Sequence, residues 1–560
     1  MDPTRAAHRG ASRGGERAAT GTTVAAGSVP GPEMTAAAFR DLLRESPTVD
    51  LGGATVDVGP GTFAIGFRQR TRLRSQHGIT IANGTIKGQL LCTGADANPA
   101  GSGVAELRLE FRNVTFRSEQ PVSEDKASDA ENATFAVRDD DLSVSQIPMV
   151  AGLVVARDIK DLTFESCTFG DADPDYKATP IVPRQEQMPR LRNVTLAPAL
   201  AVLDNSKVSI QHCAFVNKMG PGLLAKGSSV KVRRSEFSKS TTGVLVLGGA
   251  EVSLEDTISA GNDLDGLMTI GGSLKATRTT CRSNWCHGAI AEGGGVMTLI
   301  SCDISTNGWF GVHASGPGTK VEVKDMHLEH NTYAFGVVAE AGAQCTVQGA
   351  SIQGYSFSGL KAIGEGSRLT AKNVVIADRS SPRPAVADGG IGAEVADGAI
   401  LRLSGVHIHG IRKTGVWVHD AKLYAHNLET GSEVSTGVSV TGEKGRSTTD
   451  LETCKISGGK VGVKADDCSK VIMTDVNIFN CTEYGVLARN GGRVTMNRGS
   501  IVGNALQGIS IDETRSRVTM TDVAYTGNGQ NDFVGKIWIE NSEGRVSCDV
   551  GWADEDDFSE

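Results

Sequence analysis

The sequence predicts an all-β protein folded as a parallel β-helix, a solenoid in which short strands stack coil upon coil. Three observations carry this prediction. Glycine recurs about every 24 residues from Gly222 to Gly535, an interval typical of repeat arrays. Apolar residues alternate with polar ones in a short run after each of these glycines. The chain also holds 69 glycines and 39% hydrophobic residues but only 5% aromatic ones, which favours many turns around an aliphatic core.

The N-terminal region begins with two elements that are not strands. Residues 1–33 are rich in arginine and alanine and contain no apolar segment, so we expect a disordered basic tail and no secretory signal, with organelle targeting left open. Residues 34–45 place Phe39, Leu42 and Leu43 on one helical face. We expect this short helix to cap the open end of the solenoid, because terminal coils need a cover.

The strands and loops follow in order. Residues 49–118 alternate every second residue between glycine-rich turns, as in GITIANGTIKG, and predict the first coils. Two polar stretches, 119–150 and 170–190, are predicted as loop excursions. The repeat then becomes strict, so we assign 34–550 to one solenoid domain and 551–560 to an acidic tail.

Each repeat contains three short alternating strands and no helix between them. Such a unit cannot close a core alone, whereas stacked units bury columns of aliphatic side chains such as Val323. An asparagine precedes many of the recurring glycines, as Asn262, Asn284 and Asn307 do by four residues. We expect it to adopt the left-handed backbone of a tight turn and to hydrogen-bond its counterpart one coil away.

Coils such as NGWFGVHASGPGTKVEVKD and EYGVLARNGGRVTMNRGSIVGN resemble the right-handed parallel β-helix, or pectin-lyase-like, superfamily, in particular its PbH1-repeat members. The resemblance covers about residues 34–550 and implies a single-stranded right-handed parallel β-helix solenoid. The superfamily holds polysaccharide lyases, hydrolases and epimerases, phage tailspikes and non-enzymatic binding proteins. Fold alone does not choose among these functions.

The catalytic motifs of those relatives are missing. Asp466 and Asp467 resemble the paired aspartates of the pectin hydrolases, but no histidine stands one coil downstream. The D-P-H motif of the epimerases is absent. The acid-rich DADPDY lacks the glycine and distal glutamate of a calcium loop, so we expect no cofactor, with Ca²⁺ considered only for a lyase-like activity.

Aromatic residues, scarce elsewhere, recur at one turn of four consecutive coils beside an outward apolar stripe that includes Leu245, Met268 and Ile290. This pattern predicts a ligand-binding surface, made of Trp285, Trp309, Phe310, Tyr333, Phe335, Tyr355 and Phe357. The candidate acid and base groups beside it are Asp263, Asp265, His287, Glu292 and His313. Alternatively, the rings only stabilise the turn and the loop excursions cover the stripe. The two histidines differ in their offset from glycine, so no metal site is expected.

These observations favour a non-catalytic β-helix that binds a partner protein or an extended polymer along a lateral face. The alternative is a carbohydrate-active enzyme: a polysaccharide lyase, hydrolase or epimerase.

A net charge of −9 argues against a nucleic-acid partner, and no apolar run is long enough for a membrane span. The 11 cysteines are an odd number without a C-x-x-C pair, which favours reduced thiols in an intracellular, cytoplasmic protein. We expect a monomer.

Overall fold

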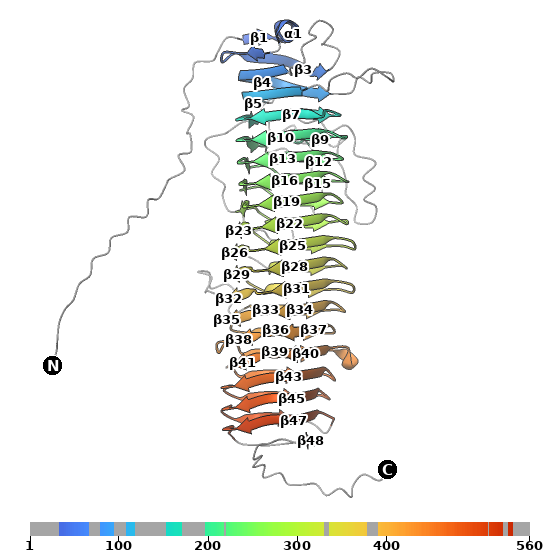
Figure 1. Ribbon diagram of the computed structural model, residues 1–560, viewed down its shortest axis with the longest axis vertical. Helices are drawn as coiled ribbons and strands as arrows, with labels where there is room; N and C mark the ends of the chain where they lie inside the picture. The colour runs from blue at the N-terminus through green and yellow to red at the C-terminus, as the bar shows by residue number, and fades with distance from the viewer. Residues whose placement is uncertain are drawn as a thin grey trace, which may run out of the picture.

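The computed structural model describes residues 33–46, 48–66, 79–93, 108–117, 153–170, 197–217, 220–329, 335–377, 390–457, 459–512, 515–529 and 536–540. Across them the chain forms an all-parallel β-solenoid of about 16 turns with about 23 residues per turn, which confirms the predicted fold class. Figure 1 shows the coils stacked along one long axis. The predicted tail and loop excursions lie outside the described residues, apart from Glu33 and Gly170, as does 551–560.

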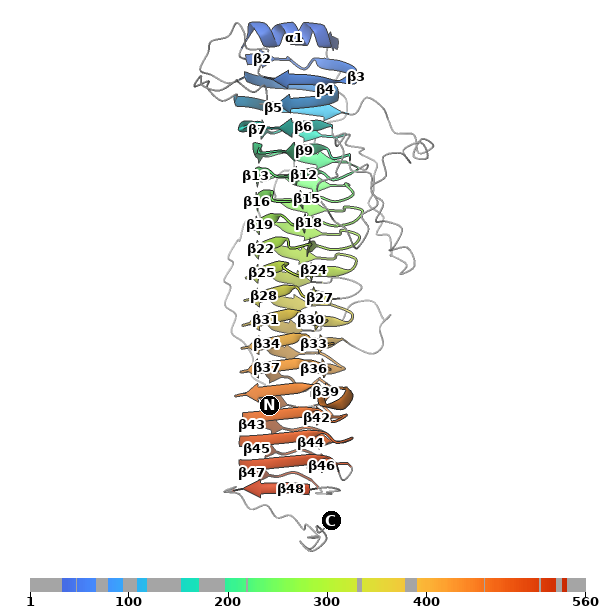
Figure 2. The same cartoon turned by 90° about the vertical axis from the view of Figure 1, so that its right-hand side faces the viewer.

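Three strands make one coil, and each pairs in parallel with its counterpart one coil away, so the strands form three long sheets. The first sheet, which is stacked along one side of the solenoid in Figure 2, contains β6 (Val154–Arg157), β9 (Leu200–Leu203), β12 (Leu223–Lys226), β15 (Val244–Leu247), β18 (Leu267–Ile270), β21 (Ala289–Glu292), β24 (Phe310–Ser315), β27 (Phe335–Glu340), β30 (Ser358–Ile363), β33 (Ile391–Ala396), β36 (Thr414–His419), β39 (Thr436–Thr441), β42 (Val461–Ala465), β44 (Tyr484–Ala488) and β46 (Gln507–Ile511).

The second sheet follows each first-sheet strand after a short turn. It contains β7 (Asp161–Glu165), β10 (Lys207–Gln211), β13 (Ser229–Arg233), β16 (Glu251–Glu255), β19 (Ser273–Thr277), β22 (Val296–Ile300), β25 (Lys320–Lys324), β28 (Gln344–Gln348), β31 (Arg368–Lys372), β34 (Ile400–Ser404), β37 (Lys422–His426) and β40 (Thr448–Glu452). A 3-10 helix, Glu443–Gly445, lies in the turn before β40.

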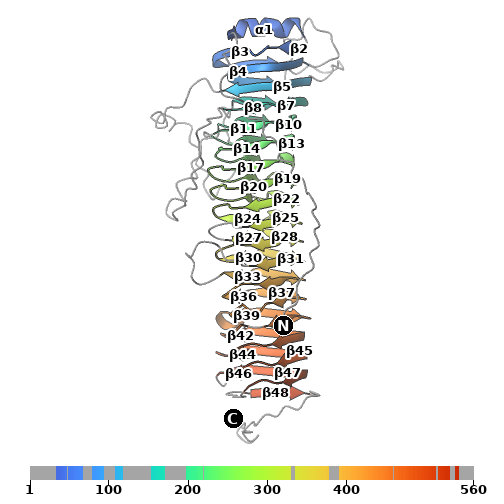
Figure 3. The same ribbon diagram turned by 90° about the vertical axis from the view of Figure 1, so that its left-hand side faces the viewer.

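The third sheet is made of very short strands, several of which are labelled in Figure 3. They are β8 (Thr168–Phe169), β11 (Ala214–Val216), β14 (Glu236–Ser238), β17 (Ile258–Ala260), β20 (Thr280–Arg282), β23 (Asp303–Ser305), β26 (His327–Glu329), β29 (Ser351–Gln353), β32 (Val375–Ala377), β35 (His407–His409), β38 (Glu429–Thr430) and β41 (Lys455–Ser457). Toward the two ends, longer strands run from one sheet into the next: β3 (Thr55–Gly66), β4 (Ile79–Thr93), β5 (Arg108–Arg117), β43 (Lys470–Phe479), β45 (Arg493–Val502) and β47 (Arg517–Thr526). The remaining strands are β1 (Glu33–Thr35), β2 (Thr48–Asp50) and β48 (Lys536–Glu540).

A short helix lies at the N-terminal end of the stack (Figure 1), as predicted. Helix α1 (Ala36–Glu45) begins at Ala36, two residues later than predicted, because Thr35 is its N-cap: the Thr35 hydroxyl accepts a hydrogen bond from the Ala38 N–H at 3.3 Å. Phe39 and Leu43 are fully buried against the first coil. The helix therefore seals the apolar interior at this end.

One continuous core runs inside the coils from Phe39 to Tyr525. Its side chains come from alternate positions of each strand, for example Val252 and Leu254 of β16, because side chains in a strand point to opposite faces. In the N-terminal coils this core holds a stack of phenylalanines. Their ring centroids lie 4.4 Å apart for Phe169 and Phe215. The interior stack consists of Phe111, Phe116, Phe164, Phe169, Phe215 and Phe237.

The asparagines before the recurring glycines form a buried ladder of side-chain amides. The Asn262 Nδ2 donates to the Asn284 Oδ1 at 2.8 Å, and the Asn284 Nδ2 donates to the Asn307 Oδ1 at 2.9 Å. The ladder was predicted, but in Asn284 and Asn307 the left-handed backbone was assigned to the wrong residue. The residue before each of these asparagines adopts it, Ser283 with φ of 54° and Thr306 with φ of 55°, whereas Asn480 adopts it itself, as predicted, with φ of 58°.

The recurring glycines are required by the close approach of successive coils. A Cβ atom on Gly266 would lie 2.6 Å from the Gly288 carbonyl oxygen and 2.7 Å from the Asn284 Nδ2. No side chain fits there without moving the neighbouring backbone. The glycine repeat that identified the fold is therefore a steric consequence of stacking one coil directly on the next.

Candidate functional site

The candidate site lies on the outer surface of the first sheet, on β21, β24, β27, β30 and β33. Register places the middle outward residue of each strand in one column, which runs Ile290, His313, Val338, Lys361 and Glu394. Before β24 this column is apolar, and from His313 on it also contains ionisable residues, with Val338 between His313 and Lys361. The site begins at His313.

Two histidine–carboxylate pairs come together on neighbouring coils. The His287 Nδ1 lies 2.6 Å from the Asp265 Oδ1, and the His287 backbone N–H donates to the same oxygen at 3.1 Å. The His313 Nε2 lies 3.1 Å from the Glu340 Oε1. The two imidazole rings stack with centroids 5.3 Å apart. Asp265, His287 and His313, all predicted as site residues, therefore form one cluster with Glu340.

The polar atoms of His313 are incompletely satisfied. Its side chain is 8% exposed, and its Nδ1 is buried without a hydrogen-bond partner among the described residues. The Nε2 contact with Glu340 is close but too poorly aligned to be a hydrogen bond, so we treat it as electrostatic. This contact is the largest cause that holds the pKa of Glu340 below its usual value. Glu340 is therefore ionised at neutral pH.

An aromatic ladder runs along the solenoid axis beside these pairs. The His287 ring stacks on Phe310 at 5.1 Å, Phe310 lies 5.4 Å from Phe335, and Phe335 stacks on Phe357 at 5.6 Å. Phe357 is 52% exposed. We call Phe310, Phe335 and Phe357 the outer ladder. It forms a row of partly exposed rings along the surface, one ring per coil.

A buried ion pair closes the far end of the outer ladder. The Lys361 ammonium lies 4.7 Å from the centre of the Phe335 ring and 2.8 Å from the Glu394 Oε1. Glu394 is only 8% exposed, and its other carboxylate oxygen accepts a short hydrogen bond from the Ser358 hydroxyl. The sequence did not single out Glu394, because the insertion between Gly359 and Gly392 obscured which coil position it occupies.

The other predicted site residues occupy different environments. Glu292 is half-buried at the outward end of β21, and Asp263 is exposed. Trp309 packs edge-on against Phe310 at 5.9 Å, whereas the indole N–H of Trp285 is buried without a partner in the described part of the chain. The assignment of Tyr355 to the binding surface is wrong, since this residue is 4% exposed and belongs to the core. Tyr333 lies outside the described residues.

The apolar stripe on the preceding coils is also buried, although it faces outward. Leu224 is fully buried and Leu245 is 6% exposed, and both belong to a cluster separate from the core inside the coils. The other members are Val155, Ala201, Leu203 and Leu247. That residues 119–150 or 170–190 cover this patch stays a prediction. The outer ladder begins beyond it, which leaves Phe357 open to solvent.

Two other charged clusters have a structural role. Asp466 is buried, and burial alone would raise the pKa of its carboxyl; contacts from Lys464 at 2.9 Å, Arg489 at 2.7 Å and Asn490 at 2.7 Å outweigh burial and lower that pKa. Both carboxylate oxygens of Asp466 have partners, so these ion pairs and hydrogen bonds connect neighbouring coils.

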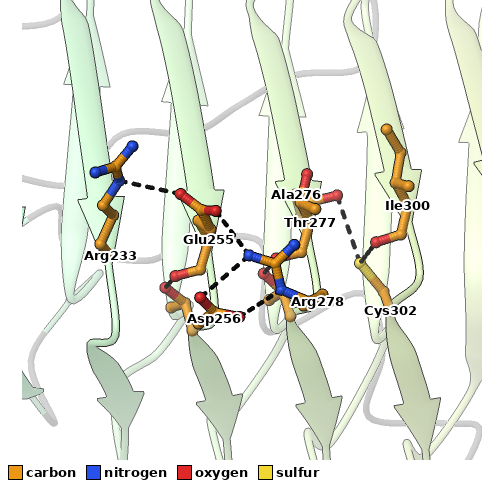
Figure 4. A network of polar contacts seen from close by, with 10 residues as sticks. Arg233, Glu255, Asp256, Ala276, Thr277, Arg278, Ile300 and Cys302 are labelled. Atoms are coloured by element: carbon orange, nitrogen blue, oxygen red, sulfur yellow. Dashed lines mark hydrogen bonds and ion pairs between the residues drawn. The ribbon is translucent and has the colours of Figure 1, made fainter.

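A second cluster is an exposed ladder of ion pairs on the second sheet and the adjoining turn. In Figure 4 the Arg278 guanidinium reaches back one coil to Glu255 at 2.7 Å and to Asp256 at 2.6 Å. Arg233 contacts Glu255 from the other side at 3.0 Å. The hydrogen bond from Arg278 lowers the pKa of Asp256. In both clusters the charged groups named here are paired with one another, so neither cluster is a candidate ligand site.

In the described ranges the cysteines lie almost entirely in the buried interior. Nine of the ten described cysteines are buried and Cys468 is exposed, and all ten are free thiols. Burial raises the pKa of the Cys345 thiol to about 12. No group of three or more His, Cys, Asp or Glu side chains in these ranges is arranged to hold a metal ion. No helix there is long and apolar enough to cross a membrane.

Comparison with solved structures finds β-helix proteins of low identity. The periplasmic alginate epimerase AlgG has a TM-score of 0.32 and 10% identity, over 60% of this chain and 76% of its own. A DFA-IIIase from Arthrobacter chlorophenolicus A6 has a TM-score of 0.26 and 11% identity, over 66% and 84%. The alginate lyase AlyGC of family PL6 has a TM-score of 0.25 and 7% identity, over 91% and 99%. At these scores the similarities carry no argument about this chain's substrate.

Comparison by sequence gives the family but no individual relative. No curated protein matches this chain. The family profile described as "Right handed beta helix region" matches residues 265–428 and 392–546, which together span half of the sequence and include the whole candidate site. The chain therefore belongs to the right-handed beta helix family.

Proposed function

We propose that the protein binds an extended polysaccharide along the outer surface of the first sheet, centred on the outer ladder. The single observation that carries this proposal is the row of Phe310, Phe335 and Phe357, spaced by 5.4 and 5.6 Å along the solenoid axis, with Phe357 52% exposed. The parts of these rings that reach the surface give apolar contact area to the C–H groups of sugars. The carboxylates and Lys361 beside them supply hydrogen-bonding partners for hydroxyl groups.

The direction of the ladder favours an elongated ligand. Each ring belongs to a different coil, and successive coils are separated by the strand spacing of about 4.8 Å. A single sugar ring would contact one or two of these phenyl groups, whereas a chain laid along the axis contacts all three. A regular row of similar contacts matches a polymer of similar units.

Glycan binding by the full chain and a Phe335→Ala/Phe357→Ala double variant tests the proposal. We expect the wild-type protein to bind at least one polysaccharide class and the double variant to lose about tenfold or more in affinity, as for aromatic anchors at interfaces. Tyr424→Ala is the matched control, because Tyr424 packs under Arg402 on the second sheet, away from the ladder. Absence of glycan binding by the wild type, or equal binding by all three proteins, would exclude this function.

A second candidate function is acid–base cleavage of the bound polymer. The observation that favours it is the His287–Asp265 pair, with Nδ1 to Oδ1 at 2.6 Å, beside the ionised Glu340. Asp265 fixes the orientation of the imidazole, which leaves the His287 Nε2 to exchange a proton. A polymer that binds should then be depolymerised by the wild type, while His287→Ala retains binding and loses turnover. A bound polymer that the wild type never cleaves would leave the protein as a binding module only.

A further inference from the structure

We infer that the outer ladder selects a polysaccharide bearing protonated amino groups, and that it excludes polyuronates. This inference rests on the proposed function, because it specifies the charge of the polymer that the same surface accepts. It follows from the distribution of charges around the phenyl rings and from an ammonium group that the chain itself places on one of them.

Carboxylates dominate the surroundings of the outer ladder. The ionisable groups described around the ladder include Asp265, in the turn before β18, and Glu292, Glu340 and Glu394 of the first sheet, against one ammonium, that of Lys361. These five groups alone carry four negative charges and one positive charge, a net charge of −3, and the sum stays negative, at −1, even if His287 and His313 are both counted as positive. A carboxylate on each sugar of a polyuronate would meet this field along its length, and like charges at an interface are strongly unfavourable.

The single cation is already neutralised by its neighbours. The Lys361 ammonium contacts the Glu394 carboxylate at 2.8 Å and is 18% exposed. It therefore offers little positive field to an anionic ligand. Glu340 is the opposite case: 38% of its side chain is exposed, and its lowered pKa keeps it charged at neutral pH. Solvent at this surface meets carboxylate oxygens more readily than cationic nitrogens.

Lys361 also shows how the surface accommodates an ammonium group. Its nitrogen lies 4.7 Å from the centre of the Phe335 ring and in contact with a carboxylate, which is a cation–π contact closed by an ion pair. One coil earlier, Phe310 contacts His313 at 4.7 Å, and His313 contacts Glu340. There the His313 imidazole, and no lysine, lies between the Phe310 ring of β24 and the Glu340 carboxylate of β27. Glu340 is 38% exposed, so its carboxylate would pair with an amino group of a bound polymer as Glu394 pairs with Lys361.

Three hexasaccharides matched in length separate the alternatives: glucosamine, N-acetylglucosamine and galacturonate hexamers, titrated into the full chain by calorimetry at about pH 6, where ordinary amines are protonated. We expect the amine-bearing hexamer to bind tightest, the neutral one more weakly, and the uronate not to bind. Added salt should weaken the first and leave the second unchanged. Equal or tighter binding of the uronate, or of the neutral hexamer, would overturn the inference while the proposed function stands. Binding of none of the three, nor of any other glycan, would remove the proposed function itself.

A Glu340→Gln variant tests whether the negative charge of Glu340 causes the preference for the amine-bearing hexamer. It should lower affinity for the glucosamine hexamer by about threefold to fivefold, the value of one partly screened ion pair. Affinity for the N-acetylated hexamer should fall by less, because glutamine keeps an oxygen that accepts a hydrogen bond from a hydroxyl group. Glu236→Gln, which removes an exposed carboxylate from the third sheet, is the matched control and should change neither. Equal losses for both hexamers would show that Glu340 acts by shape alone and would contradict charge selection.

Discussion

The molecule contains two phenylalanine ladders that differ in where their rings point. Interior rings of the N-terminal coils stack at 4.4 and 4.5 Å around Phe215 and are fully buried. Rings of the outer ladder lie 5.4 and 5.6 Å apart, partly tilted, and end in the exposed Phe357. Both follow from placing aromatic rings at equivalent positions of successive coils, one ring per coil in the outer ladder and one or two in the interior stack. The same repeat therefore builds stability when the rings point inward and a contact surface when they point outward.

The difference lies in what surrounds the rings. The interior stack lies among aliphatic side chains of the core, so the whole surface of each ring is in van der Waals contact with its neighbours. The outer ladder is bordered by imidazole, carboxylate and ammonium groups, which keep water and polar ligands within reach. The surroundings, more than the ring itself, decide whether an aromatic column is structural or available to a ligand.

The largest effect that the comparison predicts is in the interior stack. Phe215→Ala should lower the free energy of unfolding by about 3–5 kcal/mol, since it empties a fully enclosed ring site. Phe357→Ala, in the outer ladder, should change it by about 1 kcal/mol or less, because half of that side chain is already in water. Urea denaturation followed by circular dichroism compares the two. Equal losses would mean that the outer ladder is also a structural stack.

The buried asparagine ladder and the exposed ion pairs of Arg278 allow the same comparison of stability, with a smaller expected effect. Asn284→Ala should cost about 1–3 kcal/mol, because its buried amide satisfies both Asn262 and Asn307 and no water can replace it. Arg278→Ala removes two exposed ion pairs between coils, with Glu255 and Asp256 (Figure 4), and should lower the melting temperature less than Asn284→Ala does. Melting temperatures of the two variants test this order. A larger loss for Arg278→Ala would contradict it.

Sequence reasoning succeeded where the repeat is strict. Gly288 and Asn284 stand at fixed offsets because coil stacking leaves no alternative there, and the outward column through His313 follows from strand alternation. It failed where the spacing changes. The interior stack went unseen because Phe169 and Phe215, which touch, are separated by a long excursion of the chain.

The direction of side chains in the turns was also not predictable from the sequence. Tyr355 occupies a turn position that resembles those of the outer aromatics, yet it packs into the core. The direction of a side chain within a turn depends on backbone angles that alternation does not encode. The pairing of His287 with Asp265, across 22 residues, also required knowledge of which turn atoms lie above one another.

The smallest predicted effect is a difference in how stability depends on pH, between Glu340 beside the outer ladder and Phe215 in the interior stack. The contact with His313 lowers the pKa of Glu340, so the folded state favours the ionised carboxylate. The resulting stabilisation should be fully present above the ordinary glutamate pKa of about 4.3 and disappear as pH falls through the lowered value. We therefore expect Glu340→Gln to melt slightly below the wild type at neutral pH and to approach the wild type at acid pH, as the pH falls below about 4.3. The deficit of Phe215→Ala should persist at both pH values, because no titrating group contributes to the interior stack. A Glu340→Gln deficit that survives in acid would show that this side chain stabilises the fold by packing, as the interior rings do, and not by its charge.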